Sequence, residues 1–186
     1  MLKILISPFQ NLSKKQERNL TIFLITSTLI LILCMLYLDS YLKNEVCKNG
    51  IISFELAKDI AVSEKYINSW NETSKIACGI SLGLDYLFLI SYSLLIAIFI
   101  HKFNKKLWKD SSLYSFGVIL IFSLFFAGFC DAIENIGLIK LLMGSTKQQW
   151  SSVAYFFAIP KFVFIAIGIL YILFNFVYLL FKKQNK

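Results

Sequence analysis

Three carboxylates and one lysine lie inside apolar segments of this sequence that are long enough to cross a membrane. The carboxylates are Asp85, Asp131 and Glu134, and the lysine is Lys161. A charged side chain at the centre of a bilayer costs about 2.5–3.5 kcal/mol on insertion scales, so such residues usually serve a function. Their chemistry suits the binding of a proton, a cation or a polar lipid group. Paired carboxylates could also supply acid–base catalysis.

The four ionisable groups are expected at a common depth in the membrane. A helix rises about 1.5 Å per residue. Counted from the expected outer ends of the apolar segments, Asp85 and Glu134 lie roughly 12 Å deep, and Asp131 and Lys161 roughly 15–16 Å deep. We therefore predict one polar layer in the outer half of the bilayer. Depth makes Asp131 the candidate partner of Lys161, but the sequence leaves this pairing open.

Helical spacing places further polar residues beside these groups. Asp131, Glu134 and Asn135 are spaced i, i+3, i+4, so they share one helix face and Asn135 joins the predicted binding cluster. Tyr92 shares a face with Asp85 and is a further candidate contributor. Three negative charges against one positive charge are unstable in a low dielectric. At least one carboxylate should therefore be protonated, or a cation should be bound.

The elements that carry these residues are predicted from composition and apolar segments. Hydrophobic residues make up 58% of the 186 residues and charged residues 16%, whereas soluble proteins average about 45–50% and about 25%. The sequence therefore predicts an all-α membrane protein, an antiparallel bundle of four transmembrane helices in one domain over residues 1–186. The expected spans are 20–42, 76–101, 112–142 and 151–181.

The distribution of basic residues predicts the orientation in the membrane. They gather before the first span, between the second and third spans, and after the fourth: Lys3, Lys14, Lys15 and Arg18; Lys102, Lys105, Lys106 and Lys109; and the C-terminal KKQNK. The positive-inside rule therefore places both termini in the cytoplasm. Topology and contact with anionic membrane lipids explain the net charge of +8, and we expect no nucleic-acid partner.

The loop between the first two spans is expected on the outer side, with an amphipathic helix within residues 49–70. Ser53 is the predicted cap of a helix that starts near Phe54, and Trp70 should lie at headgroup level. One interpretation, which we favour, is a structural cover for the bundle. The other is a lid over a cavity, with Glu55 pointing inward as a contributor to the cluster.

The remaining reactive residues favour a protein without a metal centre. Cys47 and Cys78 both fall on the predicted outer side, where an oxidising compartment would allow a disulfide between them. No C-x-x-C pair occurs, and the lone His101 lies among lysines, which argues against a zinc or haem site. We expect no cofactor, although the carboxylates are compatible with a bound cation. Signatures of a nucleophile and its base are missing, which favours a non-enzymatic role.

Several short motifs together resemble a known group of sequences. SFELA before a Ser-Trp pair, LDYLFLISYS, AGFCDAIENI and a lysine in the last span resemble small uncharacterised bacterial four-span integral membrane proteins, over residues 49–165. The resemblance implies a bacterial inner-membrane location and no known activity. It singles out these residues: Phe54, Glu55, Trp70, Asp85, Tyr92, Asp131, Glu134, Asn135 and Lys161.

Three classes of function stay open on the sequence. The first is binding or transport of a proton, a cation or a polar lipid group, which for four spans would require a homo-oligomer or a membrane-protein partner. The second is a structural or accessory role, in which Asp85 and Lys161 form an ion pair that only fixes helix packing. The third is an enzyme that modifies a lipid or isoprenoid, for which the D-x-x-E spacing is weak support.

Overall fold

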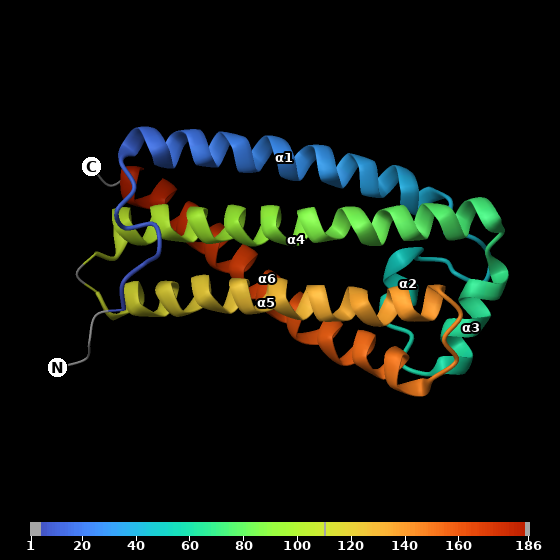
Figure 1. Cartoon of the computed structure of the whole chain (residues 1–186). Helices are drawn as coiled ribbons and strands as arrows, with labels where there is room; N and C mark the ends of the chain where they lie inside the picture. The colour runs from blue at the N-terminus through green and yellow to red at the C-terminus, as the bar shows by residue number, and fades with distance from the viewer. Residues whose placement is uncertain (1–4, 110, 185–186) are drawn as a thin grey trace.

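Six α-helices make up the computed structural model, which describes residues 5–109 and 111–184 and contains no β-strand within them (Figure 1). Four helices are long and apolar enough to cross a membrane, which confirms the prediction of an all-α, multi-pass membrane protein. They are α1 (Lys14–Ser40), α4 (Glu72–Leu107), α5 (Ser112–Leu142) and α6 (Gln148–Gln184). Two short helices, α2 (Ile51–Glu55) and α3 (Ile60–Ser69), lie between α1 and α4 in the sequence.

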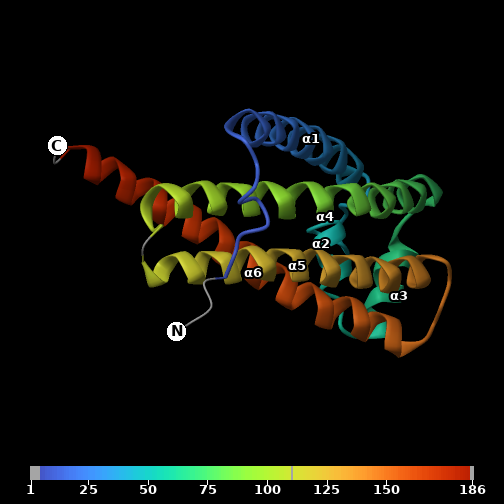
Figure 2. The same cartoon turned by 60° about the vertical axis from the view of Figure 1, so that its left-hand side comes forward.

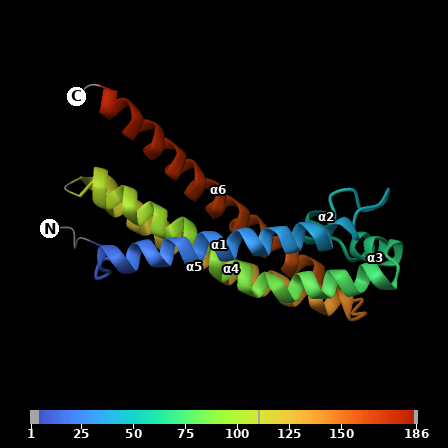
Figure 3. The same ribbon diagram turned by 90° about the horizontal axis from the view of Figure 1, so that it is seen from above.

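The four long helices pack against one another along the length of the molecule. α4 packs on α1 and α5, and α6 packs on α5 and α4. α6 crosses the other helices obliquely, and its last turns separate from α4 and α5 (Figures 1 and 3). α2 and α3 lie together at one end of the bundle, whereas the start of α1 and the end of α6 lie at the other end (Figures 1 and 2).

Polar caps fix the start of three of the long helices. The Ser13 side chain accepts a hydrogen bond from the Gln16 amide, and the Gln16 side chain accepts one from the Ser13 amide, which completes a capping box at α1. Asn71 caps α4 and Ser111 caps α5 through their side chains. α1 and α4 start several residues before the predicted spans, because polar residues form the first turns of both helices ahead of the apolar segments. The predicted third span, 112–142, matches α5.

Two glycines allow close contact between the long helices, one with a neighbouring backbone and one with neighbouring side chains. A Cβ at Gly137 of α5 would lie 2.9 Å from the Trp150 carbonyl oxygen and 3.2 Å from the Ala154 amide nitrogen of α6. A Cβ at Gly168 of α6 would lie 3.2 Å from a methyl group of Leu124 on α5. Helices that meet without a side chain at the crossing point gain close van der Waals contact, which drives helix association in membranes.

The loop between α1 and α4 differs from its prediction. The expected helix start near Phe54 with Ser53 as its cap is wrong, because α2 begins at Ile51 and Ser53 lies inside it. The cap residue is Gly50, whose φ of 56° belongs to the left-handed region that favours glycine. Asp39 at the end of α1 fixes this start, since its Oδ1 accepts a hydrogen bond of 2.7 Å from the Ile51 amide.

The same loop is broken into two helices by contacts with α6. Ala57 lies between α2 and α3, outside both helices, so its carbonyl is free to accept hydrogen bonds from side chains. Ser151 Oγ on α6 donates to this carbonyl at 2.8 Å, and Ser63 Oγ on α3 lies 3.3 Å from the same oxygen. Ser63 and Ser151 are also hydrogen-bonded to each other. Tertiary hydrogen bonds therefore replace the helical bonds that a continuous helix would make here.

Candidate functional site

A buried cluster of carboxylates surrounds the ammonium group of Lys161. Its Nζ lies 2.7 Å from Glu134 Oε2, 3.2 Å from Asp131 Oδ1 and 3.5 Å from Glu55 Oε2. The ammonium also lies 4.7 Å from the ring centroid of Phe162, within the range of a cation–π contact. Three elements thus meet at one cation: α6 supplies the lysine, α5 two carboxylates, and α2 the third.

Two hydrogen bonds join α4 to this group. The Tyr92 hydroxyl donates to Asp131 Oδ2 at 2.9 Å, and Asn135 Nδ2 donates to Asp85 Oδ2 at 2.6 Å. Asp85 therefore lies beside the cluster, where its carboxylate is bonded to an amide. Within the described residues it forms no ion pair with Lys161, so the structure gives no support to an Asp85–Lys161 pair.

Burial isolates the cluster from water and leaves some of its oxygens without donors. Asp131 is 2% exposed, Glu134 and Asn135 are 0% exposed, and Lys161 is 4% exposed. Glu134 Oε1 and Asn135 Oδ1 have neither a hydrogen-bond nor an ion-pair partner in the part of the chain that the structure describes. A buried acceptor without a donor costs about 1–3 kcal/mol, so these atoms call for added protons, water or a ligand.

Helix periodicity explains how the sequence builds this arrangement. Asp131, Glu134 and Asn135 share one face of α5, and all three are buried against α4 and α6. On α6, Lys161, Gly168 and Asn175 follow one another at intervals of seven residues, and all three are buried. This spacing keeps one seam of α6 against its neighbours, and it delivers the lysine to the acidic face of α5.

Glu55 differs from the other carboxylates because it belongs to a short helix outside the spans. It is 6% exposed, and its neighbour Phe54 is fully buried against the ring of Trp70, with ring centroids 5.3 Å apart. Burial raises the pKa of the Glu55 carboxyl group, an effect that the nearby Lys161 opposes. The docked position of α2 therefore favours the neutral acid form of Glu55.

The distances at the cluster match those of an ammonium group. Carboxylate oxygens lie 2.7–3.5 Å from Lys161 Nζ, which is the range of ion pairs between an ammonium group and carboxylates. No group of three or more His, Cys, Asp or Glu side chains among residues 5–109 and 111–184 has a geometry that could hold a metal ion. As arranged, the cluster holds the lysine ammonium.

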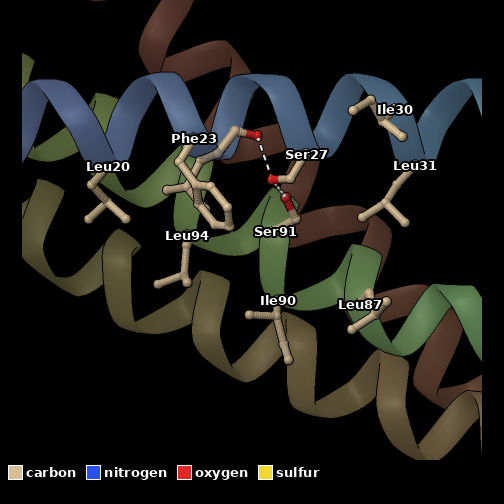
Figure 4. Close-up of a pocket in the computed structure, with 10 residues that line it drawn as sticks. Leu20, Phe23, Ser27, Ile30, Leu31, Leu87, Ile90, Ser91 and Leu94 are labelled. Atoms are coloured by element: carbon tan, nitrogen blue, oxygen red, sulfur yellow. Dashed lines mark hydrogen bonds between the residues drawn. The ribbon is translucent and has the colours of Figure 1, made fainter.

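A separate apolar groove lies between α1 and α4 (Figure 4). Its volume is about 450 Å³, and its ten lining residues are leucine, isoleucine, phenylalanine or serine. Ser91 Oγ is hydrogen-bonded to Ser27 Oγ at 2.7 Å and to Thr28 Oγ1 at 2.8 Å, so the three hydroxyl groups are partners for one another. The groove shares no lining residue with the charged cluster, and it suits an apolar chain.

The structure also holds a second polar cluster that the sequence did not predict. His101 near the end of α4 is 2% exposed, and its Nδ1 lies 2.8 Å from Ser7 Oγ. Its Nε2 lies 3.5 Å from Glu17 Oε1, which Lys105 contacts at 2.6 Å. The segment before α1 folds back over this end, with Phe9 in the core. A buried position for His101 could not be foreseen, since lysines surround it in the sequence.

Cys47 and Cys78 belong to one apolar cluster beneath α2, together with Phe54 and Trp70. Both side chains are fully buried and carry free thiols in the structure. The disulfide between them stays a prediction.

Comparison of the chain with models of protein families, with curated proteins and with solved structures found no match. The resemblance to small bacterial four-span proteins therefore stays a prediction.

Proposed function

We propose that this membrane protein binds protons at the buried cluster formed by Glu55, Asp131, Glu134 and Lys161, with Asp85 and Asn135 beside it. The observation that carries the proposal is that one ammonium group faces three buried carboxylates. Full ionisation of the cluster would leave two uncompensated negative charges on these four side chains, and a third on Asp85. Such an excess is strongly unfavourable in a low dielectric, and protons relieve it with no change in position.

The unpartnered oxygens support the same proposal. A protonated carboxyl group is a donor as well as an acceptor, so each bound proton can supply a hydrogen bond to one buried oxygen that has no donor. Glu134 Oε1 and Asn135 Oδ1 both lack donors and are fully buried on the same turn of α5. The carboxyl groups lie close enough for the charge of one to affect the next. Protons therefore bind to the cluster as a whole, and no single residue has an independent proton affinity.

The proposal includes an orientation in the membrane. We propose an antiparallel four-helix bundle in a bacterial inner membrane, with both termini in the cytoplasm and α2 and α3 on the outer side. The lysine-rich segments support this orientation, because Lys102, Lys105 and Lys106 lie at the end of α4 away from α2 and α3. Exposed Val62 on α3 is consistent with a helix that rests at the membrane surface. Membrane lipids are then the immediate partners, and a second copy or another membrane protein could complete the assembly.

Infrared spectroscopy of protonated carboxyl groups tests the proposal. We expect the wild-type protein in lipid nanodiscs to show carbonyl bands of buried carboxylic acids at pH 7, and these bands should diminish or shift in the Asp131→Asn variant. The matched control is Glu45→Gln, since Glu45 is exposed in the loop after α1. Absence of carboxylic-acid bands at pH 7 in the wild-type protein would refute proton binding.

A structural role is the second candidate, because the same contacts tie four elements together. Tyr92 and Asn135 link α4 to α5, and Lys161 links α6 to α5 and to α2. Exchange of the partners separates the two candidates: the double variant Asp131→Lys with Lys161→Asp keeps the pair but changes its surroundings. Restored stability without carboxylic-acid bands would favour the structural role.

A further inference from the structure

We infer that Glu55 is the residue through which the cluster exchanges protons with water, and that ionisation of Glu55 releases α2 from the bundle. This inference rests on the proposed function, since it assigns the access route and the moving part of the same proton site.

Glu55 is the carboxylate of the cluster with the weakest hold on the ammonium group. The Oε2 atom of Glu55 lies 3.5 Å from Lys161 Nζ, farther than the oxygens of Asp131 and Glu134. The charged groups that face it are Lys161 on α6, Asp131 and Glu134 on α5, and Asp85 on α4. Since the α5 carboxylates are nearer to the single positive charge, Glu55 docks best as the neutral acid.

The opposite direction is closed by an apolar layer. On the side of the cluster away from α2, buried residues of α4 and α5 pack against Tyr171 of α6. The layer contains Ala97, Ile98, Ile100, Leu120, Ile121 and Leu124. It separates the cluster from His101 at the far end of α4, which leaves the α2 side as the short route to water.

The attachments of α2 are few, as expected of a part that can move. Its start is held by Asp39, and the chain after it is held by the bond from Ser151 to the Ala57 carbonyl. Ile52 is 39% exposed, and Leu56 directly after the helix is 40% exposed, so only one face of this five-residue helix is buried. Phe54 and Glu55 form that face. The buried side chains through which α2 itself enters the bundle are therefore one aromatic ring and one carboxyl group.

The direction of the pH effect follows from burial of Glu55. Burial raises its pKa in the docked state, so docking takes up a proton. Docking is strongest at pH values below the ordinary pKa of a glutamate, about 4.3, and weakens as the pH rises through the raised value. Within that window the docked fraction relative to the undocked fraction falls by up to about tenfold per pH unit.

Hydrogen–deuterium exchange of the α2 amides tests this inference in the full-length protein in lipid nanodiscs. Between pH 5 and pH 9, the wild-type protection of residues 51–56 should fall relative to that of residues 60–69 in the same molecules, by at least about tenfold overall. Glu55→Gln, which keeps the shape of the neutral acid, should retain protection at high pH. The exposed control Glu45→Gln should behave as the wild type does.

Equal pH dependence of α2 protection in the wild-type and Glu55→Gln proteins would overturn the inference. Infrared bands of carboxylic acids, measured on the same samples, separate this failure from that of the proposed function. If the bands are present at pH 7 but the pH dependence of α2 protection is the same with and without Glu55, only the role of Glu55 is refuted. Bands absent at pH 7 would refute proton binding itself, whatever α2 does.

Discussion

Replacement of Lys161 by methionine is the most direct perturbation of the cluster. The change keeps most of the side-chain volume but removes the ammonium that lies 2.7, 3.2 and 3.5 Å from three carboxylates. Removal of one partner from a buried ion pair costs about 3–5 kcal/mol, because the remaining charge is uncompensated. We expect this loss of stability at pH 7 and above. It should shrink as the pH falls, since protons can then neutralise the carboxylates that the ammonium no longer balances.

Unfolding by a denaturing detergent from mild-detergent micelles, followed by tryptophan fluorescence, measures this loss. The control is Lys140→Met, because Lys140 is exposed at the end of α5 and should change stability by less than about 0.5 kcal/mol. Adding Glu134→Gln to Lys161→Met should recover part of the loss, with a coupling energy of about 0.5–3 kcal/mol. If Lys161→Met unfolds as the wild type does at every pH, the ammonium does not stabilise the cluster and our reasoning fails.

Two further changes test the packing around the site. Gly137→Ala should destabilise the protein by about 1–3 kcal/mol in the same unfolding assay, because its Cβ meets the α6 backbone. Gly83→Ala has nothing within 4 Å of its Cβ and should be neutral or stabilise by up to about 1 kcal/mol; equal losses at both glycines would contradict the close approach. Tyr92→Phe should cost about 1–3 kcal/mol, because Asp131 loses a buried donor; an unchanged midpoint would show that this bond is not formed.

The spans and the cluster could largely be predicted from the sequence, because both depend on local rules. Length and apolar composition identify the spanning helices without knowledge of their neighbours. Counting residues by the helical rise then placed Asp131 and Lys161 at one depth, and the structure places their charged atoms 3.2 Å apart. Glu134 is nearer still to the lysine, at 2.7 Å, since it lies one turn farther along the same face.

The parts that could not be predicted depend on contacts between distant segments. α2 and α3 are separate helices because Ser151 on α6 donates a hydrogen bond to the Ala57 carbonyl between them. No local pattern in residues 49–70 indicates that this partner exists. Asp85 was expected within reach of the lysine, but its bond with Asn135 follows from the rotation of α4 against α5. Burial of His101 likewise results from the segment that precedes α1 and folds back across it.

The depth of the cluster gives its protonation an electrical component. Asp131 lies 11 residues before the end of α5 at Leu142, which is roughly 16 Å of helix, or about half the thickness of a hydrocarbon core. Since α5 with its 31 residues is longer than that core, in the proposed orientation a proton that enters from the α2 end would cross at most about half of the transmembrane voltage. Since a full crossing is worth about 2.3 kcal/mol per 100 mV, an inside-negative potential of that size would strengthen proton binding by no more than roughly 1 kcal/mol. Energisation of the membrane and acidity at its surface would then act on the same carboxyl groups.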